Sequence, residues 1–444
     1  MVGRTPMLEV SQLDTGPCKL FLKLELMNPG GSIKDRIGIS MIEQAEKRGD
    51  IKPGDTLVEA TAGNTGIGLA LVASQKGYRL ILVLPDKMSQ EKIFNLRAMG
   101  AEVVLTRSDV GKGHPEYYQD LGRAIADEKS AYFINQFGNP DNPLAHEETT
   151  APEILEQMNG DVDAIVLGVG SSGTVSGIGK YLKEHAPNVE MILADPVGSV
   201  LADYINKGQL GKGGSWLVEG IGEDFIPDIA DFGQVTKAYA ISDAESFAAA
   251  RELLMREGLL AGSSTGTLLA AALKYCQEQT APKNVVSFAV DTGNKYLSKL
   301  YNDFWLEDQG FIKREQMGDL RDLIGRLHDE RATITVGPRD ILTTAHNRLR
   351  NAGFSQLPVM DDGQLVGVVT EDTIIQLVYG YPELMTAKVE EAMESAFIKL
   401  DKSESVNNLV AMLRVQPYAA ILDGDRFLGL ITRSDVLNYL RRQV

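Results

Sequence analysis

Cysteine is scarce in this chain, whose 444 residues include only Cys18 and Cys276. The two cysteines show no pairing pattern and no spacing typical of metal ligands. This argues against a disulfide framework and against a zinc site. We therefore expect two free thiols in a reducing compartment, and no metal site.

Long apolar segments are also missing. The longest apolar run, LILVLP at residues 80–85, has the length of a strand, whereas a membrane-spanning helix needs about 20 apolar residues. The N-terminal sequence MVGRTPMLEV lacks the apolar core of a secretory signal. These absences predict a cytoplasmic protein with no membrane contact.

Basic residues are outnumbered by acidic ones, 44 to 61, which gives a net charge of −17. A negative field repels nucleic acids and anionic lipid surfaces, so neither is expected as the main partner. A hydrophobic fraction of 43% is ordinary for a soluble globular protein. A chain of this length can form two or three domains with sizeable cores.

Short apolar segments alternate with amphipathic ones up to about residue 310. The segments expected to be buried parallel strands are 56–60, 79–84, 101–105, 164–170, 190–195 and 284–290. The segments expected to be helices are 66–76, 90–99, 175–186 and 243–257. This alternation predicts an α/β domain over residues 1–310 with a mostly parallel sheet.

The pattern changes after residue 310. Residues 311–330 are charged and have helical spacing, so we interpret them as a linker helix. Beyond them, residues 354–378 match residues 416–440 at a constant offset of 62 residues. Such a repeat predicts two small units, at 331–388 and 389–444, that bury a face against each other.

The stretch NPGGSIKDR at residues 28–36 combines helix-start signals with an unexpected cation. Ser32 as N-cap and Asp35 three residues later suggest a capping box for a helix that runs to Gly49. Lys34 would then face the positive end of the helix dipole. The spacing excludes a phosphate-binding P-loop. A solvated surface lysine and an amine kept neutral for Schiff-base chemistry both remain open.

Three further glycine-rich loops precede helical segments: TAGNTG at 61–66, GVGSSGT at 168–174 and AGSSTGT at 261–267. Such loops bind ligands at the carboxyl ends of parallel strands. The second could hold a single phosphate with its N–H groups, and it fits a dinucleotide fingerprint poorly. Asn64 in the first loop could bond a phenolic oxygen. Taken alone, the loop of Asn64 is better explained as a helix-capping turn, and AGSSTGT is ambiguous in the same way, because Ser264 could cap a helix.

Taken in order, NPGGSIKDR, TAGNTG, GSSGT and AGSSTG resemble the motifs of the fold type II pyridoxal-phosphate enzymes of β-replacement. This is the family of the cysteine synthases and cystathionine β-synthases, and the resemblance covers about residues 1–310. It implies pyridoxal 5′-phosphate as cofactor. It also implies a catalytic domain of two α/β subdomains with mostly parallel sheets.

The resemblance implies a role for each matching residue. Lys34 would form a Schiff base with the cofactor and move the α-proton of the substrate. Asn64 would bond the cofactor's 3′-oxygen, and Ser264 its pyridine nitrogen. The implied phosphate loop is Gly170, Ser171, Ser172, Gly173 and Thr174. The implied site for the substrate carboxylate is Thr61, Ala62, Asn64, Thr65 and Gln136.

Within this family, three stretches are more similar to cystathionine β-synthases: ADPVGS at 194–199, VEGIGEDFIP at 218–227 and NPLAHEETTAPEI at 142–154. This implies condensation of L-serine with L-homocysteine to L-cystathionine and water, a step of transsulfuration and cysteine biosynthesis. Lys34 would protonate the leaving hydroxyl. The alternatives are a cysteine synthase that uses O-acetylserine and sulfide, and a catalytically retired nucleotide sensor.

Two positions depart from the family pattern and bear on the choice of donor and acceptor. Ala62 replaces the usual serine of the substrate loop, and Glu223 stands where animal cystathionine β-synthases carry tyrosine. Glu223 is a candidate helper in protonation of the leaving group. The haem-binding N-terminal extension of the animal enzymes is absent from this sequence, so no haem is expected.

The C-terminal repeat resembles a tandem cystathionine-β-synthase (Bateman) module, an α+β fold. The resemblance implies an adenosyl ligand between the repeats, such as S-adenosylmethionine, AMP or ATP. Thr432 and Asp435 match the residues that contact ribose and phosphate, whereas the first repeat has Thr373 where the aspartate would be. A purely structural dimerisation module is the alternative. The family also implies a homodimer or a higher homo-oligomer.

Overall fold

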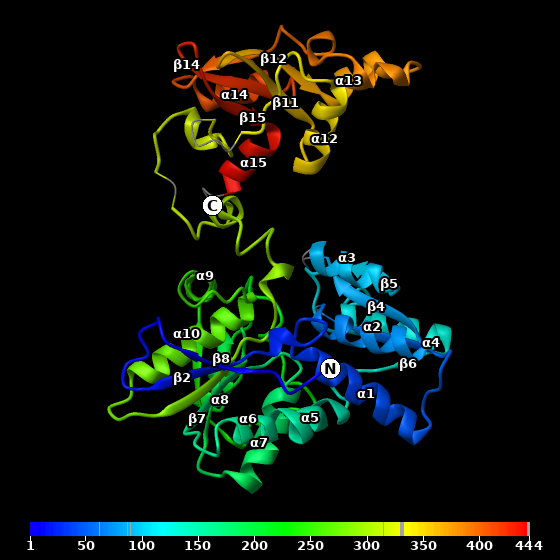
Figure 1. Cartoon of the computed structure of the whole chain (residues 1–444), viewed down its shortest axis with the longest axis vertical. Coiled ribbons are helices and arrows are strands. Elements are labelled where there is room, and N and C mark those ends of the chain that lie inside the picture. The colour runs from blue at the N-terminus through cyan, green and yellow to red at the C-terminus, as the bar shows by residue number, and fades with distance from the viewer. Residues whose placement is uncertain (62, 87, 89, 314, 329–332, 442–444) are drawn as a thin grey trace. The chain divides into compact units, whose positions relative to one another are not determined.

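The computed structural model describes residues 1–444 except 62, 87, 89, 314, 329–332 and 442–444. The chain divides into two compact units, Met1–Asn302 and Asp303–Val444, which are described separately (Figure 1). Within the described residues, no helix combines the length and apolar character needed to cross a bilayer.

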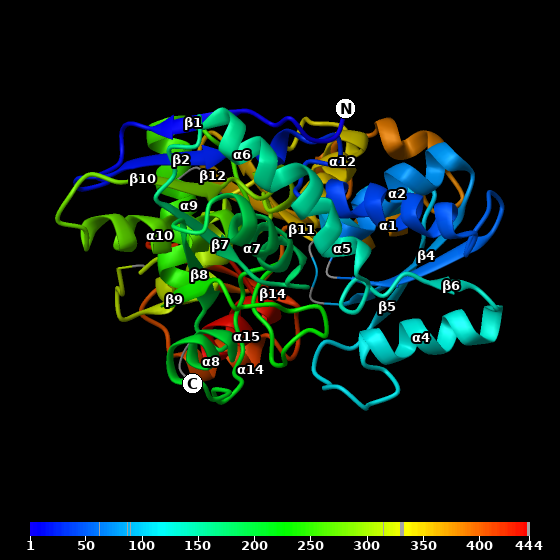
Figure 2. The same cartoon turned by 90° about the horizontal axis from the view of Figure 1, so that it is seen from below.

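A four-stranded parallel sheet lies in the first unit, in the order β5-β4-β3-β6. Its strands are β3 (Thr56–Ala60), β4 (Arg79–Pro85), β5 (Glu102–Thr106) and β6 (Tyr132–Phe133). The helices around it are α1 (Lys34–Arg48), α2 (Asn64–Lys76), α3 (Gln90–Ala98) and α4 (Tyr118–Lys129). Figure 2 shows α2 and α4 on opposite sides of this sheet.

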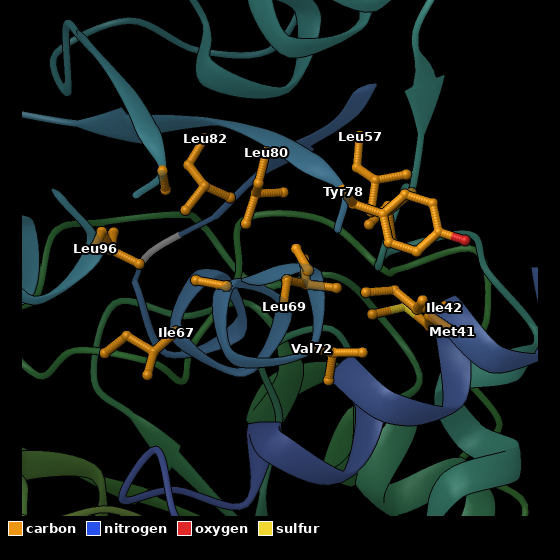
Figure 3. Close-up of a cluster of buried hydrophobic side chains, with 14 of the residues drawn as sticks. Met41, Ile42, Leu57, Ile67, Leu69, Val72, Tyr78, Leu80, Leu82 and Leu96 are labelled. Atoms are coloured by element: carbon orange, nitrogen blue, oxygen red, sulfur yellow. The ribbon is translucent and has the colours of Figure 1, made fainter. Parts of the chain in front are cut away.

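Both faces of this sheet are buried, which explains the continuous apolar strands in the sequence. Leu57, Leu80 and Leu82 point into a large core with side chains of α1, α2 and α3, including Met41, Ile67 and Leu96 (Figure 3). The alternate residues Val58 and Ile81 pack on the other face against Ala126 of α4. Since neighbouring strand residues point to opposite faces, each face receives half of the apolar side chains.

A six-stranded sheet forms the rest of the first unit, in the order β1-β2-β10-β7-β8-β9. Its strands are β1 (Met7–Val10), β2 (Lys19–Lys23), β7 (Ala164–Gly168), β8 (Glu190–Pro196), β9 (Val235–Ile241) and β10 (Asn284–Phe288). Only β1 pairs antiparallel. The helices of this part are α5 (Asp141–Ala145), a π-helix (His146–Thr150), α6 (Ala151–Gln157), α7 (Gly173–His185), α8 (Leu201–Lys207), α9 (Asp243–Glu257) and α10 (Ser263–Gln277).

The predicted α/β class with mostly parallel sheets is confirmed, and all six predicted strands and four predicted helices are present with shifts of a few residues at their ends. Strands β1, β2, β6 and β9 were not predicted from the sequence. Strand β6 has only two residues, and β1 and β9 carry few buried side chains. Such strands lack the apolar run by which the others were found.

Cys18 and Cys276 are both buried and free, and they lie next to each other. The Cys18 thiol donates to the carbonyl oxygen of Cys276 at 3.7 Å. Burial raises the pKa of the Cys276 thiol, and the neighbouring Cys18 raises it further. Both effects disfavour a reactive thiolate. Among the described residues, no cluster of histidine, cysteine and carboxylate side chains is placed to hold a metal.

The second unit contains the predicted repeat. Its first copy is β11 (Gln356–Asp361), β12 (Gln364–Thr370) and α13 (Glu371–Val378), and its second copy is β14 (Tyr418–Asp423), β15 (Arg426–Thr432) and α15 (Arg433–Arg441). The 62-residue offset holds for both strands and for the irregularity that each hairpin carries. A cluster containing Leu365, Ala420 and Phe427 joins the two copies. The other α-helices and strands of this unit are α11 (Asp303–Asp308), α12 (Leu342–Ala352), β13 (Lys399–Asp401) and α14 (Val406–Met412).

The predicted linker helix over residues 311–330 is wrong. Within the described part of that segment, the helical element is a single 3-10 turn, Leu320–Leu323. Leu320, Leu323 and Ile324 are buried with side chains of the second repeat, including Leu409 and Ile421. The apolar residues whose spacing suggested a helix are therefore part of the core of the second repeat. Short 3-10 helices also occur at Glu25–Met27, Gly293–Lys295, Pro382–Thr386 and Val389–Glu391.

Candidate active site

Lys34 is the first residue of α1, and the predicted capping box before it is wrong. Ile33 is the N-cap and makes no side-chain cap. Ser32 accepts a hydrogen bond from the Lys34 N–H at 3.2 Å, but the Asp35 carboxylate accepts from the Gly30 N–H. The two side chains thus stabilise the turn before the helix separately, and the tight loop Gly30–Gly31 replaces the reciprocal cap.

Glycines bring the helix of Lys34 against the helix of Asn64. A Cβ atom at Gly68 of α2 would lie 2.6 Å from the carbonyl oxygen of Lys34, and one at Gly38 of α1 would lie 2.6 Å from the backbone of Gly68. No side chain other than hydrogen fits at such distances. The two glycines therefore fix the spacing between the first turns of α1 and α2.

The predicted phosphate loop opens helix α7. Ser172 is its N-cap with a left-handed φ of 67°, and the first N–H groups of the helix have no partner within it. A Cβ at Gly170 would lie 2.7 Å from the carbonyl oxygen of Gly220, so the loop passes close to its neighbour. Gly170, Ser172 and Thr174 line one cleft together with Lys34. An anion bound at this helix end would therefore lie in the same cleft as the lysine.

Two buried side chains support this loop from behind. Asn142 donates to Ser171 Oγ at 2.9 Å and to the carbonyl oxygen of Gln136 at 2.8 Å. His146 Nε2 lies 3.2 Å from Thr174 Oγ1, and its Nδ1 lies 2.9 Å from Thr150 Oγ1. Burial lowers the pKa of His146 far below its usual range, and the charge of Lys34 lowers it further. The imidazole is therefore neutral beside the loop.

Asn64 begins α2 and does not cap it, since Gly63 is the N-cap. Its amide nitrogen donates to the Asp291 carboxylate at 2.7 Å, and its amide oxygen accepts from Lys295 at 3.0 Å. Ser264 lies buried in the first turn of α10, whose N-cap is Gly262. The helix-cap interpretations of Asn64 and Ser264 are therefore wrong. Their proposed contacts with a cofactor stay predictions.

The predicted substrate loop leads from β3 into α2. Thr61 accepts from the Gly63 N–H at 3.1 Å, and Thr65 donates to Gln136 Oε1 at 2.7 Å. Gln136 also donates to the carbonyl oxygen of Ala60 at 3.0 Å. Both the oxygen and the nitrogen of the Gln136 amide are thus engaged by protein groups. In this arrangement the amide orients Thr65. Ala62 lies outside the described residues.

The charge of Glu223 affects the pKa of Lys34 and of Tyr118, an aromatic residue that was not predicted to belong to the site. Its charge raises the pKa of Lys34 and, after burial, is the main cause that raises the pKa of Tyr118. The ring of Tyr118 contacts Tyr117 and Phe137 at centroid distances of 4.9 and 6.4 Å. Tyr117 and Tyr118 carry no motif, so only the charge of Glu223, which raises the pKa of both, relates them to the site.

Burial lowers the pKa of Lys34 to about 8, although Glu223 opposes this shift. Half of this amine is therefore neutral near pH 8, whereas an ordinary lysine reaches that point at about pH 10.4. The neutral amine is the nucleophilic form. The local conflict of a cation at a helix N-terminus is thus resolved by a shift toward the uncharged form.

This shift can be measured on the cofactor-free protein. Trace acetylation of Lys34 by acetic anhydride, followed by peptide mass spectrometry, should rise with pH to a midpoint near 8. Free Nα-acetyl-lysine in the same tube provides the reference, with a midpoint near 10.4. A Lys34 profile that coincides with the reference profile would contradict the depressed pKa.

Thr432 and Asp435 lie at a cavity of about 540 Å³ in the second unit. The cavity is within the usual size range for small ligands, and Phe354 and Gln356 of the first repeat line its other side. Asp435 accepts from the Thr432 N–H at 2.7 Å and from its hydroxyl at 2.6 Å. Burial raises the pKa of Asp435. In the first repeat, the hydroxyl groups of Thr370 and Thr373 bond each other instead.

Comparisons with known proteins agree with this division of the chain. The family model described as pyridoxal-phosphate dependent enzyme matches residues 1–291, and the CBS domain model matches residues 324–380 and 389–442. Cystathionine beta-synthase of Apis mellifera is 35% identical over 99% of this chain and 90% of its own length, and that of Dictyostelium discoideum is 36% identical over 99% and 91%.

A solved structure, the O-acetylserine dependent cystathionine beta-synthase from Helicobacter pylori, is 38% identical, with a TM-score of 0.62. It covers 67% of this chain and 95% of its own length. The match of the first unit to a family model, together with near full-length similarity to the curated relatives, settles the family. The chain belongs to the pyridoxal-phosphate-dependent enzymes, as a lyase of the cystathionine beta-synthase family with a tandem CBS module.

Proposed function

We propose that this protein joins L-serine to L-homocysteine in a β-replacement that yields L-cystathionine and water. The observation that carries the proposal is the single cleft that Lys34 shares with the loop at the N-terminus of α7. A nucleophilic amine and an anion-binding helix end are the two groups that a phosphorylated aldehyde cofactor requires. The nearly full-length similarity to cystathionine beta-synthases supports the choice of substrates.

The residues present fit pyridoxal 5′-phosphate. The N–H groups of Gly170–Thr174 would hold its phosphate, because Gly170 has no room for a side chain and Ser172 takes a left-handed conformation. Lys34 would hold its aldehyde carbon, Asn64 its 3′-oxygen and Ser264 its ring nitrogen. When bound, the cofactor supplies an electron sink for carbanion chemistry at the substrate α-carbon.

The chain's own residues supply binding and proton transfer. Thr61 and the N–H groups at the start of α2 would hold the substrate carboxylate, with Thr65 oriented by Gln136. Lys34 Nζ would remove the proton from the substrate Cα, because its pKa near 8 keeps part of the amine neutral at physiological pH. The resulting ammonium would then give its proton to the leaving β-oxygen. Glu223 favours this charged form of Lys34.

A second candidate function is β-replacement on O-acetylserine with sulfide or homocysteine. It is favoured by the solved relative whose title describes an O-acetylserine dependent enzyme. Ala62, in place of the usual serine of the substrate loop, and Glu223, in place of the tyrosine of animal cystathionine β-synthases, are departures that bear on the choice between the two donors. Acetate is the better leaving group, so such an enzyme depends less on protonation of the leaving oxygen.

The two candidates differ in one assay on the purified protein loaded with pyridoxal phosphate. We expect a higher kcat/KM with serine plus homocysteine than with O-acetylserine plus sulfide. The opposite preference would replace the first proposal with the second. Each pair is to be measured with and without S-adenosylmethionine.

We also propose that the 540 Å³ cavity binds an adenosyl ligand. Asp435, which lines the cavity together with the acidic residues Glu307 and Asp308, would accept hydrogen bonds from the two ribose hydroxyls. The N–H and hydroxyl of Thr432 hold that carboxylate in place. Binding of a ligand here would allow the module to modulate the enzyme.

Asp435→Asn is expected to weaken binding of the adenosyl ligand by about 10- to 100-fold, because a hydrogen bond to a charged group contributes about 1.5–3 kcal/mol. Calorimetry of the full chain with S-adenosylmethionine, AMP and ATP measures the effect. The matched control is Asp372→Asn, an exposed aspartate in the first turn of α13. If the wild type binds none of the three compounds, the module is structural.

We further propose that the chain is a cytoplasmic homodimer. Ile375 on α13 and Leu437 on α15 occupy equivalent positions of the two repeats, and both are more than half exposed. Tyr379 and Leu440, on the same segments, are exposed as well. Two apolar side chains repeated at equivalent positions suit a self-complementary contact between two copies. Sedimentation of the wild type and of the double variant Ile375→Glu, Leu437→Glu tests this assembly.

A further inference from the structure

The segment that follows β10 connects three of the glycine-rich motifs. The carbonyl oxygen of Asp291 accepts from the Gly262 N–H at 2.9 Å, and the Thr292 N–H donates to the carbonyl oxygen of Gly31 at 3.0 Å. The side chain of Asp291 reaches Asn64. The segment 291–295 therefore contacts the loops that carry Lys34, Asn64 and Ser264, although it has no motif of its own.

Lys295 is a buried lysine whose three N–H donors are all used. Its ammonium donates to the carbonyl oxygens of Gly30 and Gly31 at 2.8 and 3.2 Å, and to Asn64 Oδ1 at 3.0 Å. An ammonium group has three donors and no acceptor. Lys295 thus holds the loop before Lys34 and the side chain of Asn64 at the same time, and its exposed fraction is 4%.

Asp291 holds the other end of the Asn64 amide. Its Oδ2 accepts from Asn64 Nδ2 and from the Tyr296 hydroxyl, both at 2.7 Å. A carboxylate accepts only and an ammonium donates only, so the two partners exclude a flipped amide. Asp291 and Lys295 are buried, while Asn64 is only partly buried. The amide is therefore fixed from behind, with its nitrogen held by Asp291 and Tyr296 and its oxygen held by Lys295.

We propose that Lys295 and Asp291 are positioning residues that fix the amide of Asn64 so that its nitrogen, and not its oxygen, is presented to the 3′-oxygen of the cofactor. The inference rests on the proposed place of Asn64 against pyridoxal phosphate. An amide with the wrong face forward would present its oxygen to the electron-rich phenolic oxygen and repel it. Lys295 and Asp291 hold the amide in the correct orientation before the cofactor binds. Binding therefore does not have to include the free-energy cost of turning the amide.

The test is a double-mutant cycle on cofactor binding. Apoprotein variants Asn64→Ala, Lys295→Met and the double variant are titrated with pyridoxal phosphate, and Kd is read from fluorescence quenching. Each single variant should raise Kd about tenfold, and the double variant no more than about twofold above Asn64→Ala. The visible absorption band of the loaded protein should shift in the same direction in both single variants.

Additive effects would overturn the inference, since a lysine that acts only on general folding would raise Kd by the same factor with or without Asn64. Lys299→Met is the matched control, because Lys299 lies four residues further along the chain and pairs with Glu219 at 2.7 Å. It should leave the absorption band unchanged. If Lys295→Met does not fold, Asp291→Asn replaces it in the cycle. A wild type that does not bind pyridoxal phosphate would instead refute the proposed function.

Discussion

Lys34→Ala is expected to lower kcat by roughly a thousandfold or more, and to leave the protein colourless after incubation with pyridoxal phosphate. The amine has two functions in the proposed reaction, as the group that holds the cofactor and as the base at the substrate Cα. Removal of a general acid–base alone costs about 10²–10⁴ in rate, and removal of the covalent anchor adds to that loss. Steady-state kinetics and an absorption spectrum measure both effects.

The matched control for this variant is Lys47→Ala, which removes an exposed lysine from the same helix. It should retain the activity and colour of the wild type. A Lys34→Ala protein with more than a tenth of the wild-type kcat would show that another group is the base. Activity restored by added primary amines would support the assignment, because a soluble amine then replaces the missing proton acceptor.

Arg36→Met is expected to destabilise the first unit by about 3–5 kcal/mol, the usual cost of leaving a buried ion unpaired. Arg36 bonds Glu25 through two nitrogen atoms at 2.8 Å, and it bonds Glu153 at 2.7 and 2.8 Å. The side chain of Glu25 is fully buried. Without Arg36, its charge would lack its main partner.

Intrinsic fluorescence can report this loss from the first unit alone. The chain has two tryptophans, Trp216 in the first unit and Trp305 in the second. In a Trp305→Phe background, Arg36→Met should lower the Tm reported by Trp216 by on the order of 10 °C. Arg107→Met, which removes an arginine with 51% of its side chain exposed and with the exposed partners Asp109 and Glu116, should change Tm by no more than about 2 °C. Equal shifts in the two variants would contradict the argument.

The same ion group predicts an acid sensitivity. Burial raises the pKa of Glu153, but hydrogen bonds from Arg36 and Lys23 outweigh it and lower that pKa to about 2. A carboxylate with a depressed pKa stabilises the folded state above its unfolded pKa near 4.3, and this contribution is lost as the pH falls toward 2. The stability difference between wild type and Arg36→Met should therefore shrink below about pH 4.

Sequence patterns predicted those parts of the fold that depend on local signals. The buried strands were found because both sheet faces are covered, and the 62-residue repeat gave the hairpin bounds of the second copy from those of the first. The capping box at Ser32 failed because the rule considers only local partners. In the structure, Ser32 pairs with Asp291 and the Asp35 carboxylate bonds Gly30.

The residues of the site that lie in sequence motifs were predicted, whereas their partners elsewhere in the chain were not. Asn64 and Asp291 are 227 residues apart and contact each other through side chains alone, so no local pattern relates them. Tyr118 near Glu223 is a similar case. The linker helix failed for a different reason, because Leu320, Leu323 and Ile324 have helical spacing but belong to a core formed with the second repeat.

The two copies of the repeat match in backbone, but they differ in the side chain at the equivalent positions 356 and 418. Gln356 lines the cavity near Asp435, whereas its counterpart Tyr418 is buried and donates to Glu394 at 2.6 Å. Duplication thus preserved the scaffold, whereas the glutamine that lines the cavity in the first copy is replaced by a buried tyrosine in the second. If the proposed adenosyl ligand occupies the cavity beside Asp435 alone, each chain binds one ligand. A sigmoidal dose–response would then have to arise between copies of the chain and not within one chain.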